Sequence, residues 1–248
     1  MNHLMREKEN FMRRLHYKSC IKYFIFILIL GIICISNFKI EDYYEAKTQG
    51  VSATSYYETE RALRKIEIPR LIVIDAGHGD LDSGSENLGY LEKDINLELA
   101  LKLEDALKEA GYAVVMTRND DSFLELYERS DLANAIKADL FISIHQNSYM
   151  EDSSVNGIEV YYNSEKSTDD EELAQSIQDG LINETRATDR EIRADNGLVV
   201  IRETTMPAVL IETAYISNKN ELSLITSDNY QDKVIRGIMA GIEEFLNQ

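Results

Sequence analysis

The sequence predicts a single α/β domain with a mostly parallel, twisted sheet of about six strands and helices on both faces. From Leu71 onward, short apolar runs alternate with segments whose apolar residues recur every three or four positions. That alternation is typical of a parallel sheet covered by helices. The run Leu71–Asp75 is apolar up to its last residue, as expected for a strand buried on both faces. A hydrophobic content of 44% is enough for a full core.

The first strand follows Pro69, which suits a strand start because it has no N–H to donate. Asp94 is expected to cap the first helix, whose apolar residues Ile95 and Leu99 begin a four-residue repeat, and Gly111 is expected to end it. The other five strands are expected from short runs of apolar, β-branched or aromatic residues. They are Tyr112–Thr117, Leu140–His145, Gly157–Tyr162, Leu198–Arg202 and Ala208–Glu212.

Three more helices are expected at Phe123–Ala138, Asp170–Glu184 and Tyr230–Leu246. The last is amphipathic, with apolar residues four positions apart on one side. Polar stretches at 150–155 and 164–170 are expected to be surface loops.

The chain before the domain divides by composition into a basic N-terminus (1–22), an apolar segment (23–38) and a polar, Tyr-rich linker (39–68) that precedes a globular domain at 69–248. The thirteen-residue run Tyr23–Ile35 is short for a spanning helix, which needs roughly 17–25 residues, and it fits a signal-peptide core equally well. The basic flank indicates that the N-terminus stays in the cytoplasm. We therefore expect a signal anchor with an extracytoplasmic domain at the cell membrane, or a secreted domain if the segment is cleaved.

The charge of the domain argues against nucleic-acid binding, and its lack of cysteine excludes disulfides and thiolate ligands. Of the 26 Lys/Arg and 44 Asp/Glu residues, seven and two lie in residues 1–40, which leaves 19 and 42 for residues 41–248, a charge near −23. Such a domain is not expected to bind nucleic acid, whose phosphates require basic residues. Both cysteines, Cys20 and Cys34, precede the domain, which therefore needs neither a disulfide nor a thiolate ligand.

Two histidines and two glutamates lie at the ends of the predicted elements. His78 follows the first strand, Glu92 comes fourteen residues later before a helix, His145 ends the strand that begins at Leu140, and Glu212 ends the strand that begins at Ala208. The carboxyl ends of strands in an α/β fold converge on one crevice. Two imidazoles and one carboxylate leave an open position for water on a tetrahedral Zn²⁺, and a second carboxylate can move protons. This combination is suited to metal-assisted hydrolysis.

Each of these residues also has a structural interpretation. Asp75 either caps a turn or orients an imidazole. A glutamate before a helix, such as Glu92, is by spacing alone more often a favourable partner of the helix dipole than a metal ligand. Glu212 could instead form an ion pair with a nearby Lys or Arg, because a carboxylate at the end of a buried strand needs a partner.

The motifs that contain these residues resemble, in order, those of the zinc-dependent N-acetylmuramoyl-L-alanine amidases of the autolysin type. The resemblance covers about residues 71–247 and includes departures at Ala76, usually proline, and at Thr213-Ala214-Tyr215. It rests on Ile74-Asp75-Ala76-Gly77-His78-Gly79, Leu91-Glu92-Lys93-Asp94, Met116-Thr117-Arg118, Leu126 to Arg129 with Ala133-Asn134, Phe141 to Asn147, and Met206 to Glu212 with Ile216-Ser217-Asn218.

The resemblance implies that His78, Glu92 and His145 bind Zn²⁺ and that Glu212 is the general base and acid. It implies that the substrate is peptidoglycan and that the bond cut joins the lactyl group of N-acetylmuramic acid to L-alanine. A short chain with a membrane segment and no wall-binding repeats resembles the spore-cortex type acting in germination more than a secreted autolysin. An activating protein partner is left open.

Two alternatives remain. One is a zinc peptidase acting on wall peptides, although no arginine stands out as the clamp that such enzymes use for a terminal carboxylate. The other is a tethered, non-catalytic wall-binding module, which would be expected to lack one of the four site residues, and all four are present.

Overall fold

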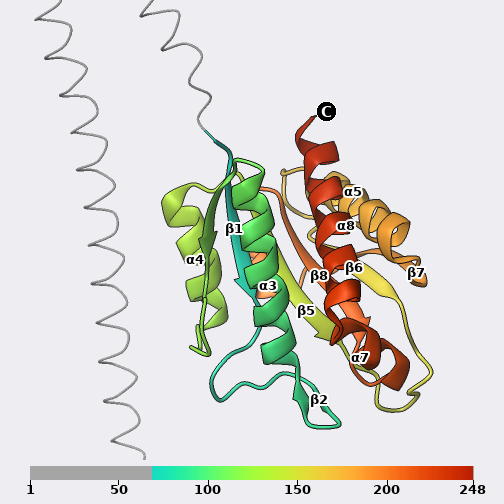
Figure 1. The fold of residues 1–248 in the computed structure, drawn as a ribbon. Helices are drawn as coiled ribbons and strands as arrows, with labels where there is room; N and C mark the ends of the chain where they lie inside the picture. Colours follow the sequence, from blue (N-terminus) through green and yellow to red (C-terminus); the bar gives the residue numbers. More distant parts are fainter. Residues whose placement is uncertain (1–68, 248) are drawn as a thin grey trace, which may run out of the picture. The chain divides into compact units, whose positions relative to one another are not determined.

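The computed structural model describes residues 69–247 (Figure 1). The predicted basic N-terminus (1–22), apolar segment (23–38) and linker (39–68) lie outside the described residues. Within residues 69–247, no helix combines the length and the apolar character needed to cross a membrane.

A six-stranded sheet forms the centre of the domain, in the order β4-β1-β5-β8-β6-β7. The first four strands in this order run parallel, β6 runs antiparallel to β8, and β7 pairs parallel with β6. The predicted mostly parallel sheet of about six strands is therefore confirmed. The strands are β4 (Ala113–Met116), β1 (Leu71–Ala76), β5 (Leu140–Asn147), β8 (Ala208–Tyr215), β6 (Ile158–Tyr162) and β7 (Asp189–Ala194).

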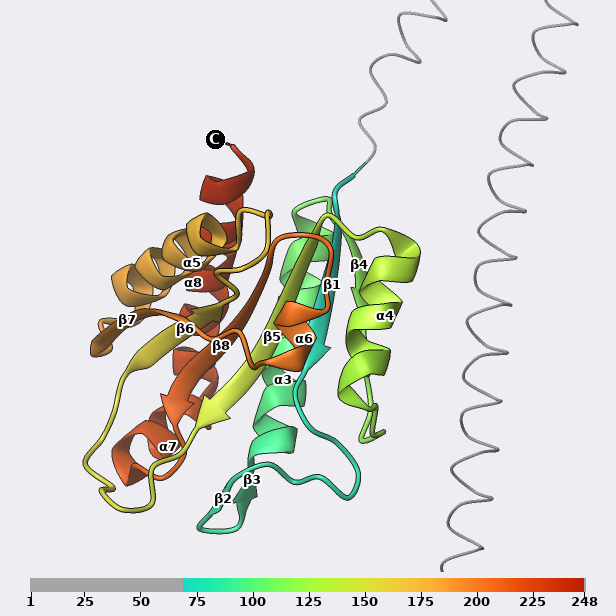
Figure 2. The same ribbon diagram turned by 180° about the vertical axis from the view of Figure 1, so that it is seen from behind.

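Helices cover both faces of the sheet, as predicted (Figures 1 and 2). Alternate residues of a strand point to opposite faces. Accordingly, Ile72 and Ile74 of β1 join a core with α3, α5 and α8, whereas Val73 joins a second core with α4 and α6. The helices are α3 (Glu92–Glu109), α4 (Leu126–Ile136), α5 (Asp170–Thr185), α6 (Val199–Arg202), α7 (Lys219–Ile225) and α8 (Asp228–Leu246).

The predicted strand at Leu198–Arg202 is wrong, because these residues form the short helix α6. A short apolar run does not distinguish a strand from a buried helical turn, and here Val200 and Ile201 are buried in the second core. The sixth strand is instead β7, an edge strand with the polar sequence Asp-Arg-Glu-Ile-Arg-Ala. Charged residues on edge strands prevent pairing with other chains, and they also remove the apolar signal that predicts a strand.

The start of the first helix also differs from the prediction. Asp94 does not cap this helix, since α3 begins at Glu92 and Asp94 lies in its first turn. A small hairpin of β2 (Glu86–Asn87) and β3 (Tyr90–Leu91), which was not predicted, leads directly into Glu92. The hairpin and the helix together fix where the Glu92 side chain lies.

Candidate metal centre and active site

Three of the four predicted site residues meet at the carboxyl edge of the parallel strands. His78 lies in the turn after β1, His145 lies near the end of β5, and Glu92 is the first residue of α3. One ligand atom from each of these three side chains lies within 4.8 Å of the other two. Among residues 69–247, these three side chains are the one group of His, Cys, Asp and Glu residues placed closely enough to hold a metal ion.

The Glu92 carboxylate is the centre of this cluster. Its Oε1 atom lies 3.0 Å from Nε2 of His78 and 3.1 Å from Nδ1 of His145. The backbone N–H of Gln146 also donates to Oε1, and that of Ser85 donates to Oε2. Burial opposes ionisation of this carboxyl, but the hydrogen bonds to both histidines outweigh it and lower the pKa of Glu92. Glu92 is therefore a carboxylate, as a metal ligand must be.

His78 has a backbone and a side chain that are both constrained. Its φ of 65° lies in the left-handed region, which few residues other than glycine adopt. Its Nδ1 atom lies 2.8 Å from Oδ2 of Asp82, which leaves Nε2 facing Glu92. A carboxylate on the second ring nitrogen is the usual partner of a metal-binding histidine. Asp82 was missed by sequence reasoning, although its spacing of four residues from His78 was available as a signal.

Two glycines allow the ligands to approach one another. A Cβ atom added to Gly77 would lie 2.3 Å from the ring of His145, and one added to Gly84 would lie 2.6 Å from Oε2 of Glu92. Real Cβ atoms do not come this close to other atoms, so any side chain at Gly77 would displace the imidazole of His145. Glycine at both positions therefore leaves the space that the side chains of His145 and Glu92 occupy.

Asp75 takes neither of the two roles that the sequence left open. Its buried carboxylate accepts hydrogen bonds from Oγ1 of Thr117 (2.7 Å), Oγ of Ser143 (2.8 Å) and Nη1 of Arg129 (2.9 Å). Arg129 then donates from Nη2 to the carbonyl oxygen of His78 at 2.9 Å. Asp75 thus holds Arg129, and Arg129 holds the backbone of the His78 turn.

Glu212 lies beside the cluster on β8. It is the register partner of His145 on β5 and of Glu159 on β6. Its Oε2 atom is buried without a hydrogen-bond partner among residues 69–247, and no ion pair to Glu212 is formed within that range. The alternative of a structural ion pair is therefore not supported. Burial, together with the charges of Glu92 and Glu159, raises the pKa of Glu212 well above its ordinary value of 4.5.

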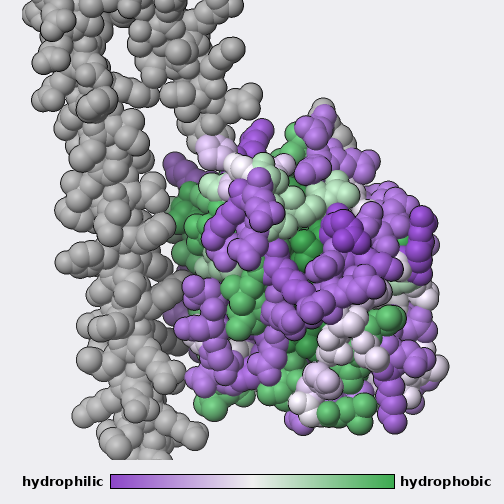
Figure 3. Space-filling view, viewed as in Figure 1, coloured by the Kyte–Doolittle hydropathy of each residue, from purple (hydrophilic) through white to green (hydrophobic). Residues whose placement is uncertain are grey.

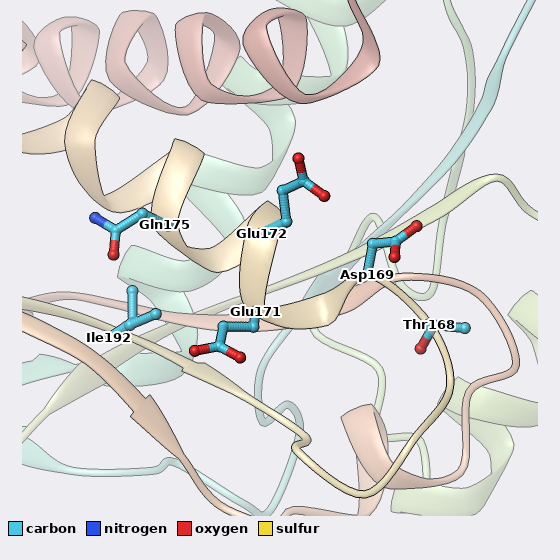
Figure 4. Close-up of a pocket in the computed structure, with 6 residues that line it drawn as sticks. All are labelled: Thr168, Asp169, Glu171, Glu172, Gln175 and Ile192. Carbon is cyan, nitrogen blue, oxygen red and sulfur yellow. The ribbon is translucent and has the colours of Figure 1, made fainter. Parts of the chain in front are cut away.

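A surface depression lies away from this cluster, at the start of α5 (Figure 4). Asp170 of this helix accepts a hydrogen bond from the N–H of Ala208, where β8 begins, so the depression is at the amino end of β8, whereas Glu212 lies four residues further along that strand. The side chains of Glu171 and Glu172 point away from each other. This depression therefore lacks the convergent groups of the His78 cluster. It is lined by Thr168, Asp169, Glu171, Glu172, Gln175 and Ile192.

Comparison with known proteins identifies the family. The N-acetylmuramoyl-L-alanine amidase LytC from Bacillus subtilis is 36% identical over a match that covers 86% of this chain and 41% of LytC. The germination-specific N-acetylmuramoyl-L-alanine amidase from the same organism is 33% identical over a match that covers 72% of this chain and 81% of the relative. This chain also resembles the solved structure of the CwlD amidase from Clostridioides difficile in complex with the GerS lipoprotein. The match covers 72% of this chain and 98% of CwlD, with a TM-score of 0.69 and a sequence identity of 33%. The family profile described as N-acetylmuramoyl-L-alanine amidase matches residues 72–244. This chain therefore belongs to the N-acetylmuramoyl-L-alanine amidase family.

Proposed function

We propose that this chain is a zinc-dependent amidase that cuts peptidoglycan between the lactyl group of N-acetylmuramic acid and L-alanine. The observation that carries the proposal is the convergence of His78, Glu92 and His145 within 4.8 Å, next to the buried Glu212 carboxyl, whose Oε2 atom has no hydrogen-bond partner in the described part of the chain. Membership of the family supports the reaction and the substrate class.

The donor set fits zinc. Two imidazole nitrogens and one carboxylate oxygen are ligands of catalytic zinc sites, which keep a fourth position open. Glu92 is held ionised, and Asp82 occupies the ring nitrogen of His78 that faces away from Glu92. When bound, zinc supplies a Lewis acid that polarises the scissile carbonyl and makes water more acidic.

Glu212 is the proton carrier in this proposal. It accepts a proton from the attacking water and delivers it to the nitrogen of L-alanine as the amide bond breaks. A group that must both accept and donate works best with a pKa near the working pH. Burial and the neighbouring carboxylates raise the pKa of Glu212, and a cation held by Glu92 would lower it again.

An extracytoplasmic location is part of the proposed function, because peptidoglycan lies outside the cell membrane. The apolar segment at 23–38 and its basic flank support an anchored or exported domain. A role in the spore cortex is supported by the similarity to the germination-specific relative. An activating protein partner is supported by the complex of the related CwlD with a lipoprotein.

Mass spectrometry of digested peptidoglycan tests the reaction. We expect the full-length, zinc-loaded chain to release stem peptides with L-alanine at their N-terminus. The Glu212→Gln variant is expected to lose about 10²–10⁴-fold in kcat, since general acid–base catalysis contributes that much, while it binds zinc normally. Arg236→Gln, which changes an exposed residue paired with Glu184 on another face, is the matched control.

Two other results would contradict this assignment. Cleavage within the stem peptide would identify a zinc peptidase. Binding to peptidoglycan without any cleavage, by a folded and zinc-loaded chain, would identify a tethered wall-binding module.

A further inference from the structure

The edge strand β7 contains a bulge that changes the direction of its arginines. Ile158 of β6 pairs with Asp189, but Val160, two residues on, pairs with Ile192, so β7 holds one extra residue. Within this bulge Glu191 has a φ of 66°, a strained conformation for a residue other than glycine. Bulges commonly re-aim side chains next to active sites, and strained residues concentrate at functional sites. The bulge is therefore expected to redirect the side chains on either side of it.

The bulge brings two arginines to one carboxylate. Arg190 and Arg193 are three positions apart and would point to opposite faces of a regular strand. Instead, Nε of Arg193 lies 2.6 Å from Oε2 of Glu159, and Nε of Arg190 lies 3.6 Å from Oε1. Glu159 is 1% exposed and is also held by Nδ2 of Asn147 and the hydroxyl of Tyr215. One carboxylate thus faces two guanidinium groups.

This cationic pair is linked to the proposed proton carrier through Glu159, on the strand between them. Glu159 is the register partner of Glu212, and Tyr161, two residues further along β6, is the register partner of Arg193. Residues paired across strands share one face of the sheet, so all four side chains are on the same side. The pKa of Tyr161 supports this arrangement: burial raises it first, the charges of Glu159 and Glu212 raise it further, and Arg193 lowers it.

Arg193 is available to a ligand. Its side chain is 48% exposed, and Nε is the atom that lies against Glu159. Arg190 is more enclosed, with its guanidinium carbon 5.0 Å from the ring centre of Tyr215. The planar guanidinium fork binds carboxylates with two parallel hydrogen bonds. In a chain with a net charge of −18, a cationic pair at the site edge is unlike its surroundings.

We propose that Arg193, supported by Arg190, forms a subsite beside Glu212 that binds a carboxylate of the substrate's peptide. This inference rests on the proposed amidase function and adds a specificity determinant to it. In the intact substrate the lactyl carboxyl is itself part of the amide, so negative charge is carried by the peptide that follows L-alanine. Glu159 is a positioning residue, because it fixes the direction of both arginines without reaching the substrate.

A pair of synthetic substrates tests the subsite. Both are N-acetylmuramoyl-L-alanyl dipeptides with an amidated C-terminus; one has glutamate as its second residue and the other has glutamine. For the full-length, zinc-loaded chain we expect KM to be about tenfold lower for the glutamate compound, with similar kcat, because a hydrogen bond between charged groups contributes about that much. In Arg193→Gln, KM for the glutamate compound should rise to that of the glutamine compound, whose own KM should not change.

Two further variants separate binding from a structural role. Arg193→Lys keeps a cation beside Glu159 but lacks the fork, so it should fold like the wild type and lose part of the preference. If circular dichroism shows that Arg193→Gln does not fold, Arg193→Lys alone tests whether Arg193 binds the substrate carboxylate. Arg236→Gln also removes one guanidinium, on α8, where Arg236 pairs with Glu184 and not with Glu159, and it should keep the full preference.

Calorimetric titration of the Glu212→Gln chain with both compounds gives a readout that needs no turnover. We expect the glutamate compound to bind about tenfold more tightly, and Arg193→Gln to remove that difference. Equal KM and Kd values for the two compounds in the parent chain would overturn the subsite, as would an equal loss for both compounds in the Arg193 variants. If neither compound is cut while the glutamate compound still binds preferentially, the amidase function fails and the subsite stands.

Discussion

Asp82 decides which nitrogen of His78 faces the cluster. With Oδ2 of Asp82 at 2.8 Å from Nδ1, the ring presents Nε2 to Glu92. The same contact restricts rotation of the imidazole, which is only partly buried. At the scale of single residues, the metal centre therefore depends on a carboxylate that does not reach the metal position itself.

Replacing Asp82 tests this dependence. Asp82→Asn keeps the size of the side chain but removes its charge, so we expect zinc affinity to fall by about 10–100-fold, as is usual for the partners of metal ligands. Competition with a chromophoric chelator measures the affinity. Asp152→Asn, at an exposed loop position, is the control and should bind zinc as the parent does. Unchanged affinity in Asp82→Asn would show that the ring is positioned by other contacts.

At the scale of elements, the turn after β1 and the end of β5 are packed so closely that only glycine fits at residue 77. The added Cβ of Gly77→Ala would lie 2.3 Å from the His145 ring. The ring must then move, and a misplacement of about 1 Å in an active site can cost about 100-fold in rate. We expect that loss in kcat while the chain remains folded. Gly197→Ala, where the added Cβ meets a side-chain atom at 3.1 Å, should leave the rate unchanged.

The Asp75–Arg129 pair joins β1 to α4 and makes stability depend on pH. Burial alone would raise the pKa of Asp75, but Arg129 and the hydrogen bonds of Thr117 and Ser143 outweigh it and lower the pKa below 3.8. Because the folded-state pKa is depressed, this carboxylate stabilises the fold above the unfolded-state pKa. That stabilisation is lost as the pH falls through the folded-state value.

Urea denaturation of Asp75→Asn tests this pH dependence. At pH 6 the variant should be about 3 kcal/mol less stable than the parent, because removing one partner leaves a buried charge unpaired. The difference should begin to shrink as the pH falls below 3.8, where the unfolded parent takes up a proton, and it should be lost once the pH passes the lower folded-state pKa of Asp75. A difference that stayed constant between pH 6 and pH 3 would contradict the depressed pKa.

At the scale of the whole molecule, the proposed zinc site connects three elements that are far apart in the sequence. A ligand that binds only the folded state stabilises it by about 2.7 kcal/mol at a concentration 100 times its Kd. We therefore expect the melting temperature, measured by calorimetry, to fall when a chelator removes zinc and to recover when zinc is added back. His145→Ala should melt at one temperature regardless of zinc. If the parent chain also melted independently of zinc, the metal site would be wrong.

The sequence alone predicted much of the fold and the composition of the site. Short apolar runs predicted five of the six strands and periodic apolar residues predicted the four long helices, because both signals are local properties of the chain. The convergence of His78 and His145 also followed from local patterns, since residues at the carboxyl ends of parallel strands meet at one edge. The place of Glu92 beside them was implied by the resemblance to the amidases, because its spacing alone favoured a helix-dipole partner. The role of these residues and of Glu212 in catalysis stays a prediction until it is measured.

The tertiary structure decided what surrounds those residues. No local pattern indicates that Glu159 lies beside Glu212 or that Arg190 and Arg193 both reach Glu159, because these neighbours depend on the strand order β8-β6-β7 and on a bulge in β7. The same reason explains why α6 forms where a strand is predicted. Whether Val200 and Ile201 pack as a helical turn or in the sheet depends on the core residues that surround them. Spacing along the chain determines which chemical groups are present at the edge of the sheet, whereas strand register determines which of them touch.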